Sequence, residues 1–158
     1  MPDESTAAYP FGDLLALARQ SWLGEMASRL ARLGYADYRR SDAAAVRLLR
    51  RGPVPVGQLG TALGVTRQAA RKAADALQQR GFATTRRDPR DSRQLNVALT
   101  PAGQDYARAV TAVIDELNRE VARRVEPAQL AAADAVLRAV LFDASARQRA
   151  AWLPRPDG

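Results

Sequence analysis

Residues 65–103 read VTRQAARKAADALQQRGFATTRRDPRDSRQLNVALTPAG, and they give the main sequence evidence for the fold. Thr66 is suited to cap a helix whose small apolar side chains recur at helical spacing, and Gly81 ends that helix. Two strand-like segments follow, residues 82–87 and 95–99, joined by a turn rich in Asp and Arg. A helix, a strand, a charged turn and a second strand in this order predict a winged helix, which presents one helix and one hairpin to a nucleic acid.

The net charge of +7 lies entirely in the middle of the chain. Residues 1–41 carry five Arg against five Asp and Glu, and residues 101–158 carry eight against eight. Residues 42–100 carry eleven Lys and Arg against four Asp. Concentrated positive charge attracts a polyanion, because each neutralised phosphate releases a counterion. Charge alone therefore favours a nucleic acid as partner, with an acidic protein or a membrane surface as the alternatives.

Length and composition narrow the class of protein further. A chain of 158 residues is expected to form a single domain over residues 1–158. The chain contains no Cys and no His, so we expect no disulfide, no zinc or copper site, no cofactor and no His-based catalysis. No apolar run approaches the roughly 18 residues that a membrane span needs, and no secretory signal is visible. We therefore expect a cytoplasmic protein with no membrane partner.

The winged helix-turn-helix lobe is predicted over residues 42–100. Asp42 is the candidate N-cap of its first helix, which should stop before Gly52. Residues 54–56 are too short and too Pro-bearing for a central strand but fit an edge strand. A brief helix then ends at Gly64. The predicted buried face of the following helix consists of Ala70, Ala73, Ala74 and Leu77.

Amphipathic helices are predicted on both sides of this lobe, over residues 11–34 and 101–145. The pair Thr100-Pro101 is typical of a helix start, and Pro127 restarts the second region as a further helix. The apolar stripes of that region are Val110, Val113, Ile114, Leu117, Val121 and Val125, then Leu130, Val136, Leu137, Val140 and Leu141. The lobe offers little surface to cover these stripes, so we expect the two regions to form the interface of a homodimer. Packing within a monomer is the alternative. Residues 1–10 and the end from Trp152 onward are expected to be irregular.

The helix that begins after Thr66 has the composition of one that enters a major groove. Thr66 and the helix N-terminus can hold a phosphate, Gln68 can pair with adenine, and Arg71 can read guanine or bind phosphate. The predicted DNA-binding residues of this helix are Thr66, Arg67, Gln68, Ala69, Arg71 and Lys72. The alternative is an ordinary amphipathic helix with a solvated face. That alternative explains less well why the basic residues gather in the first half of the helix.

The turn from Asp88 to Arg93 allows two interpretations. Arg90 at its tip could reach a narrow minor groove, where the negative potential is enhanced. Asp88 and Asp91 would then orient the guanidinium groups around them. The predicted DNA-binding residues of this wing are Arg86, Arg87, Arg90 and Arg93. A salt-bridged surface hairpin without a ligand is the alternative.

At these residues the sequence resembles the multiple-antibiotic-resistance regulator (MarR) family. The wing pattern of that family, Asp-x-Arg-x-x-Arg, is matched by Asp88, Arg90 and Arg93. A helix that ends in Leu-x-x-x-Gly precedes it, here residues 77–81. A strand that closes on Leu-Thr-x-x-Gly follows it, here residues 99–103.

The resemblance implies a mostly helical, homodimeric winged helix-turn-helix repressor that binds a pseudo-palindromic operator. It also implies that residues 66–72 read the major groove and that Arg90 enters the minor groove. Small, often phenolic ligands bind such proteins where the dimer region meets the DNA-binding lobe. Trp22, Tyr35 and Tyr38 lie near that predicted junction and could line an aromatic pocket, although Trp22 fits a core position equally well. The oxidant and zinc inputs of some members are excluded here, since both Cys and His are absent.

Three functions compete on this sequence. The first is a sequence-specific DNA-binding transcriptional regulator with double-stranded DNA, a second copy of itself and a small-molecule effector as partners. The second is a winged-helix protein-interaction module whose basic face docks an acidic partner. The third is an enzyme, for which Asp115 and Glu116 are the best carboxylate pair. These two are adjacent on a helix and diverge by about 100 degrees, so we expect no enzymatic activity and no catalytic residues.

Overall fold

The computed structural model describes residues 10–151 and residue 153. The irregular ends predicted for residues 1–9 and for Trp152 and residues 154–158 lie outside these described residues. The described residues form two compact units, one that ends at Arg40 and one that begins at Ser41. Within the described residues, no helix combines the length and the apolar character needed to cross a membrane.

The first unit consists of one long helix, α1 (Phe11–Arg32), and the segment that follows it. The helix begins at Phe11, where the predicted helical region of residues 11–34 begins, and Asp13 lies in its first turn. Basic side chains lie in its last turn, and these charges at both ends complement the helix dipole. Met26 and Leu30 are its buried residues, one helical turn apart.

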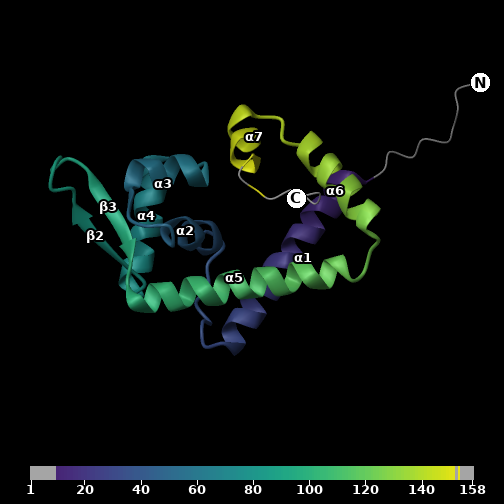
Figure 1. Ribbon diagram of the computed structural model, residues 1–158, viewed down its shortest axis with the longest axis horizontal. Helices are drawn as coiled ribbons and strands as arrows, with labels where there is room; N and C mark the ends of the chain where they lie inside the picture. The colour runs from purple at the N-terminus through teal and green to yellow at the C-terminus, as the bar shows by residue number, and fades with distance from the viewer. Residues whose placement is uncertain (1–9, 152, 154–158) are drawn as a thin grey trace, which may run out of the picture. The chain divides into compact units, whose positions relative to one another are not determined.

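The second unit contains the remaining helices and a small sheet (Figure 1). Its elements are α2 (Asp42–Leu49), β1 (Val54–Pro55), α3 (Val56–Leu63), α4 (Arg67–Gln79), β2 (Ala83–Arg87), β3 (Leu95–Leu99), α5 (Pro101–Ala122), α6 (Pro127–Ala139) and α7 (Ala144–Ala150). The predicted fold class, mainly helical with a β-hairpin wing, is confirmed. Helix α7 was not predicted as a separate element. Its start is fixed by the Asp143 side chain, which accepts a hydrogen bond of 2.7 Å from the backbone N–H of Ala146.

The three strands form an antiparallel sheet in the order β1-β3-β2. Strand β1 lies at the edge, as predicted, with Pro55 opposite Asn96. An edge is where a strand tolerates proline, because the missing N–H costs no ladder hydrogen bond there. The wing hairpin pairs Ala83 with Leu99 and Arg87 with Leu95, and Val97 in the central strand is fully buried.

Small side chains let α4 pack closely inside the lobe. Ala70, Ala74 and Leu77 recur at helical spacing and are buried, as predicted, and α3 and β2 pack against this helix. Ala73 was expected on the same face but is only half-buried. It lies to the side of the buried stripe, because three residues advance a helix by about 300 degrees rather than a full turn.

The start of α5 is held against the end of the wing. Thr100 caps the helix, accepting a hydrogen bond of 3.0 Å from the N–H of Gly103 and donating one of 2.6 Å to the carbonyl of Gly81. A Cβ on Gly103 would collide with the carbonyl oxygen of Phe82, so only glycine fits this close approach. The Leu-Thr-x-x-Gly pattern therefore has a direct packing reason in this chain.

Asp42 does not cap α2, and that prediction is wrong. The N-cap position belongs to Ser41, and Asp42 lies inside the helix with a side chain only 3% exposed. Both of its carboxylate oxygens accept hydrogen bonds from Arg80, at 2.9 and 3.0 Å. A buried carboxylate needs such a cation, because removing a charge from water is costly unless it is paired.

Aromatic side chains complete the surroundings of this ion pair. The Tyr106 hydroxyl donates a hydrogen bond of 2.6 Å to Asp42, and the ring of Tyr106 stacks on Phe82 with 4.4 Å between centroids. The Arg80 guanidinium lies 5.3 Å from the Phe82 ring centre, within cation–π range. Burial and the neighbouring carboxylate raise the pKa of Tyr106 far above its ordinary value, so the phenol stays protonated and donates. The cluster joins α2, the C-terminal end of α4, and α5.

Replacing Arg80 with Ala should lower the free energy of unfolding by about 3–5 kcal/mol, because the variant leaves a buried carboxylate without its cation. Urea denaturation followed by circular dichroism measures this change. Arg124→Ala, which removes a guanidinium that is 75% exposed on the segment after α5, is the control and should change the free energy by less than about 0.5 kcal/mol. Equal losses in the two variants would contradict a structural role for the ion pair.

Candidate nucleic-acid interface

The N-terminal end of α4 is an exposed, electropositive helix start. Thr66 is extended and its hydroxyl oxygen accepts a hydrogen bond of 3.1 Å from the N–H of Ala69, so the predicted N-cap is confirmed. The hydroxyl can still donate its own hydrogen to a ligand. The six side chains predicted to contact DNA from this helix are all exposed, namely Thr66, Arg67, Gln68, Ala69, Arg71 and Lys72. The helix dipole adds positive potential to the charges gathered here.

Arg71 forms an ion pair within α4. Its Nε lies 2.9 Å from a carboxylate oxygen of Asp75, one helical turn further on, and the Arg71 side chain is 52% exposed. Exposed pairs at this spacing contribute only about 0.3–0.5 kcal/mol. Arg71 can therefore exchange Asp75 for another acceptor at little cost.

The wing turn is built by carboxylate-to-backbone hydrogen bonds. One oxygen of Asp88 accepts from the N–H of Arg90 at 2.8 Å and from that of Asp91 at 3.3 Å. The other oxygen accepts from the side chain of Asn96 at 3.0 Å. Asp91 accepts from the N–H of Arg93 at 2.9 Å. Both carboxylates bind amides and so shape the backbone that carries the arginines, whereas their orienting of guanidinium groups stays a prediction.

All four arginines of the wing are exposed, and one of them, Arg87, also supports the turn. Arg87 donates a hydrogen bond of 2.6 Å to the carbonyl of Ser92, across the neck of the hairpin. Arg86, Arg90 and Arg93 are exposed. In Figure 1 the hairpin extends away from α4, so these side chains lie on a projecting element.

Residues of α4 and of the wing line one depression of about 390 Å³. Arg67 at the start of α4 lines it, as does Arg93 at the end of the wing turn. Its other polar side chains are Gln58, Thr61, Asp91 and Gln94. Two basic residues that are far apart in the sequence therefore share one concave surface.

The pKa of Asp88 lies below its ordinary value of 3.8. The hydrogen bond from the backbone N–H of Arg90 is the main cause, and the one from the Asn96 side chain adds to it. Both bonds favour the charged carboxylate. Asn96 was not among the predicted site residues, and its partner lies eight positions away across the hairpin.

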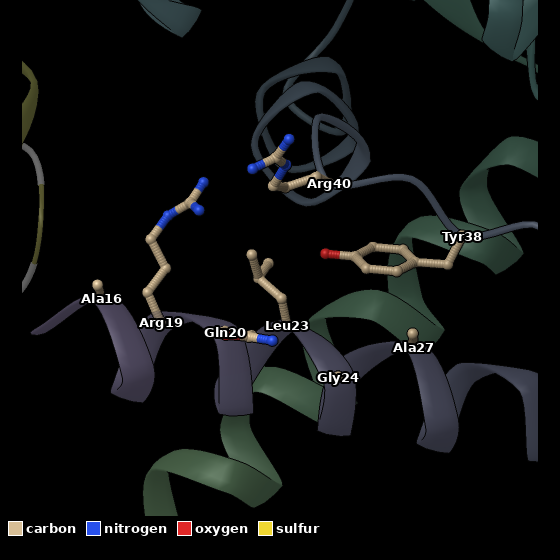
Figure 2. Close-up of a pocket in the computed structure, with 8 residues that line it drawn as sticks. All are labelled: Ala16, Arg19, Gln20, Leu23, Gly24, Ala27, Tyr38 and Arg40. Atoms are coloured by element: carbon tan, nitrogen blue, oxygen red, sulfur yellow. The ribbon is translucent and has the colours of Figure 1, made fainter. Parts of the chain in front are cut away.

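A second concave site lies within the first unit (Figure 2). This cavity of about 550 Å³ is lined on α1 by Ala16, Arg19, Gln20, Leu23, Gly24 and Ala27, and after the helix by Tyr38 and Arg40. Figure 2 shows the Tyr38 hydroxyl directed toward Leu23, with the side chains of Arg19 and Arg40 on the same side of the helix. Tyr38 was predicted to line a pocket, whereas Trp22 and Tyr35 do not line this one.

Sequence reasoning missed the two arginines of this cavity. The signal was present on α1, where Ala16, Gln20, Leu23 and Ala27 recur at intervals of three and four residues. Such spacing places small and apolar side chains along one face of a helix. Among the described residues, no group of three or more acidic side chains is arranged to hold a metal ion.

Three short helices followed by a hairpin, with a small strand at the sheet edge, define a winged helix-turn-helix lobe. The model of the MarR family matches residues 36–94, which include α4 and the wing turn. Over these residues the chain is similar to the MarR family of winged-helix regulators. A comparison with curated proteins found no matching relative.

Solved structures share the fold over most of their length. A probable transcriptional regulator from Pseudomonas aeruginosa is 24% identical, with a TM-score of 0.70 over 83% of this chain and 96% of its own. A cysteine-to-serine variant of MarR from E. coli, complexed with operator DNA, is 20% identical, with a TM-score of 0.72 over 88% and 99%. BpsR from Bordetella bronchiseptica, whose DNA binding is regulated by 6-hydroxynicotinic acid, is 19% identical, with a TM-score of 0.71 over 90% and 99%.

Acidification should loosen the wing turn, and the transition should lie at a pH below 3.8. The pKa of Asp88 is lowered from 3.8, so its charged carboxylate still holds the turn at pH 3.8. The turn loses this support as the pH falls through the lowered pKa of Asp88. NMR chemical shifts of the Arg90 and Asp91 amides, followed from neutral to acid pH, report the transition. In the Asp88→Asn variant this transition should disappear. A midpoint at or above 3.8 in the unaltered protein would show that the carboxylate does not hold the turn.

Proposed function

We propose that this protein is a transcriptional repressor that binds a pseudo-palindromic DNA operator as a homodimer and releases it on binding a small aromatic ligand. In this proposal α4 reads base edges in the major groove. The wing enters the adjacent minor groove through Arg90, while Arg86, Arg87 and Arg93 contact or support it there.

The observation that carries the proposal is the position of the excess charge. The entire net charge of +7 comes from residues 42–100, and the exposed cations of that segment include those at the start of α4 and on the wing. A helix N-terminus and a basic hairpin match the two grooves of a duplex better than they match an irregular acidic protein. The depression shared by Arg67 and Arg93 supports a single surface formed by both elements.

The homodimer is supported by apolar side chains that remain exposed near the ends of the chain. No described residue of α6 is buried, and Val136 and Leu137 are each 47% exposed. Val121 and Val125, at and after the end of α5, are exposed as well. Further exposed apolar residues lie on α1, namely Leu14, Leu15 and Leu17. Exposed apolar side chains on several helices are typical of an interface, and a two-fold axis lets the same helices of two subunits cover each other.

The ligand is supported by the chemistry of the cavity on α1. Arg19 and Arg40 offer two cations, Gln20 and Tyr38 offer polar groups, and Leu23 offers an apolar wall. A small aromatic carboxylate satisfies all three features at once. We therefore assign the effector site to this cavity rather than to Trp22 and Tyr35.

Two arginine variants distinguish base reading from phosphate contact on an operator selected from random duplexes. Arg71→Ala should weaken specific binding by about 1–3 kcal/mol and relax the preference at one base position. Arg90→Ala should weaken binding to most sequences alike and reduce the salt slope by about 1. Fluorescence anisotropy over a salt series measures both effects, with Arg123→Ala on the far end of α5 as the control. Equal losses that ignore sequence in both variants would contradict the assignment of α4 as the reading helix.

A charge placed on the exposed face of α6 should separate the subunits. Leu137→Glu is expected to convert a dimer to a monomer in sedimentation velocity, because it places a carboxylate in an apolar interface. Gln79→Glu adds the same charge at an exposed position on α4 and should leave the dimer intact. A monomer in the unaltered protein, or a dimer in both variants, would show that α6 does not form a dimer interface.

Benzoate-type carboxylates should release operator DNA, whereas benzyl alcohol should not. Arg19→Ala should weaken their effect about 10- to 100-fold, since hydrogen bonds to charged groups contribute about 1.5–3 kcal/mol. Arg32→Ala, at the end of α1 and outside the cavity lining, is the matched control. Identical release curves for the two variants would show that the ligand binds elsewhere.

A further inference from the structure

Helix α7 has an inward face that the proposed function does not use. Ala150 is buried, and Ala146 and Arg149 are half-buried, whereas Arg147 and Gln148 are exposed. Positions 146, 149 and 150 are separated by three and four residues, so they share one side of the helix. A buried helix face is packed against other parts of the protein. Two sets of contacts identify the partners of α7.

One set ties α7 to α6 and the connection between them. Arg138 on α6 donates a hydrogen bond of 3.1 Å to the carbonyl of Ala150 at the far end of α7. Arg147 donates hydrogen bonds to the carbonyls of Leu141 and Phe142, at 3.0 and 2.7 Å. These bonds satisfy carbonyls at helix ends that would otherwise lack donors. They fix α7 to the end of α6.

The other contact lies on the turn of the helix-turn-helix. The Arg149 guanidinium occupies the space where a Cβ of Gly64 would stand. Gly64 ends α3 with a left-handed φ of 68 degrees, and Thr66, the cap of α4, follows two residues later. A cation at the C-terminus of a helix is favourable, because the last carbonyls carry partial negative charge. Arg149 is itself held by the Ser145 hydroxyl at 2.5 Å.

We infer that α7 is a brace that links the end of α6 to the helix-turn-helix turn, and that Arg149 is a positioning residue for α4. It acts through Gly64, fixing the turn from which the DNA-reading helix starts. The brace itself follows from the contacts of α7, whereas its effect on DNA rests on the proposed function.

Native-state hydrogen exchange tests the brace without DNA. The Val65 amide, which donates a hydrogen bond of 3.0 Å to the carbonyl of Gly60, reports opening of the turn. Arg149→Ala should speed its exchange about two- to fivefold, the range expected for losing a cation at a helix C-terminus. Arg123→Ala removes an exposed cation after α5 and should leave this exchange unchanged. Equal exchange in the two variants would overturn the brace.

A double variant tests the contact itself. Gly64→Ala should raise the exchange rate strongly in the unaltered background, where the new Cβ meets both an unfavourable φ and the guanidinium. In the Arg149→Ala background the clash with the guanidinium is absent. The Gly64→Ala change should then raise the exchange rate by a factor at least about twofold smaller. Additive effects would show that Arg149 does not occupy this space.

DNA binding distinguishes positioning from direct contact. Arg149→Ala should weaken binding to the selected operator about two- to fivefold and leave the salt slope unchanged, because no phosphate contact is lost. A slope reduced by about 1 would make Arg149 a phosphate ligand and overturn the positioning role. If the unaltered protein does not distinguish operator from scrambled DNA, the proposed function fails, while the hydrogen-exchange result still decides whether the brace exists.

Discussion

The ion pair between Asp42 and Arg80 is the constraint on which the arrangement of the lobe depends. A carboxylate this deeply buried has to keep its cation, and Arg80 reaches it with both terminal nitrogens. The Tyr106 hydroxyl adds a third donor from α5. The pair therefore fixes three elements relative to one another, and one of them is the C-terminal end of α4. With that end held inside the lobe, the start of α4 is left exposed, where Thr66 caps it.

This anchoring separates the basic residues into two groups with different roles. Arg80 is engaged inside the lobe, and its pKa is raised because the paired carboxylate outweighs the effect of burial. The other cations of α4 and all four arginines of the wing are exposed, and Asp88 and Asp91 shape the wing backbone. Concentrated charge is normally unfavourable through self-repulsion, so its retention on projecting elements is best explained by a polyanionic partner. In the proposed function, the lobe supplies rigidity and the exposed arginines supply recognition.

The parts of this structure that could be predicted are those that depend on residues close together in the sequence. Thr66, Thr100 and Pro101 mark helix starts locally, and alternation around Val97 marks a strand. Asp42 has the same local signature as an N-cap, but its partners lie 38 and 64 residues away, so the short-range pattern misled. Helix α7 is too short for a hydrophobic period, and its cap at Asp143 is its main signal. The lining of the cavity on α1 combines one helix face with side chains beyond the helix, which no single period reveals.

In the proposed function, the basic lobe recognises a DNA sequence and does not merely attract polyanions. Fluorescence anisotropy with the unaltered protein, on an operator selected from random duplexes and on a scrambled duplex at the same salt concentration, tests it most directly. We predict saturable binding to the operator at least about 1,000-fold tighter than to the scramble, with two half-sites about 10 base pairs apart. Equal, weak binding to both duplexes would contradict the claim and would favour an acidic protein as the partner of this surface.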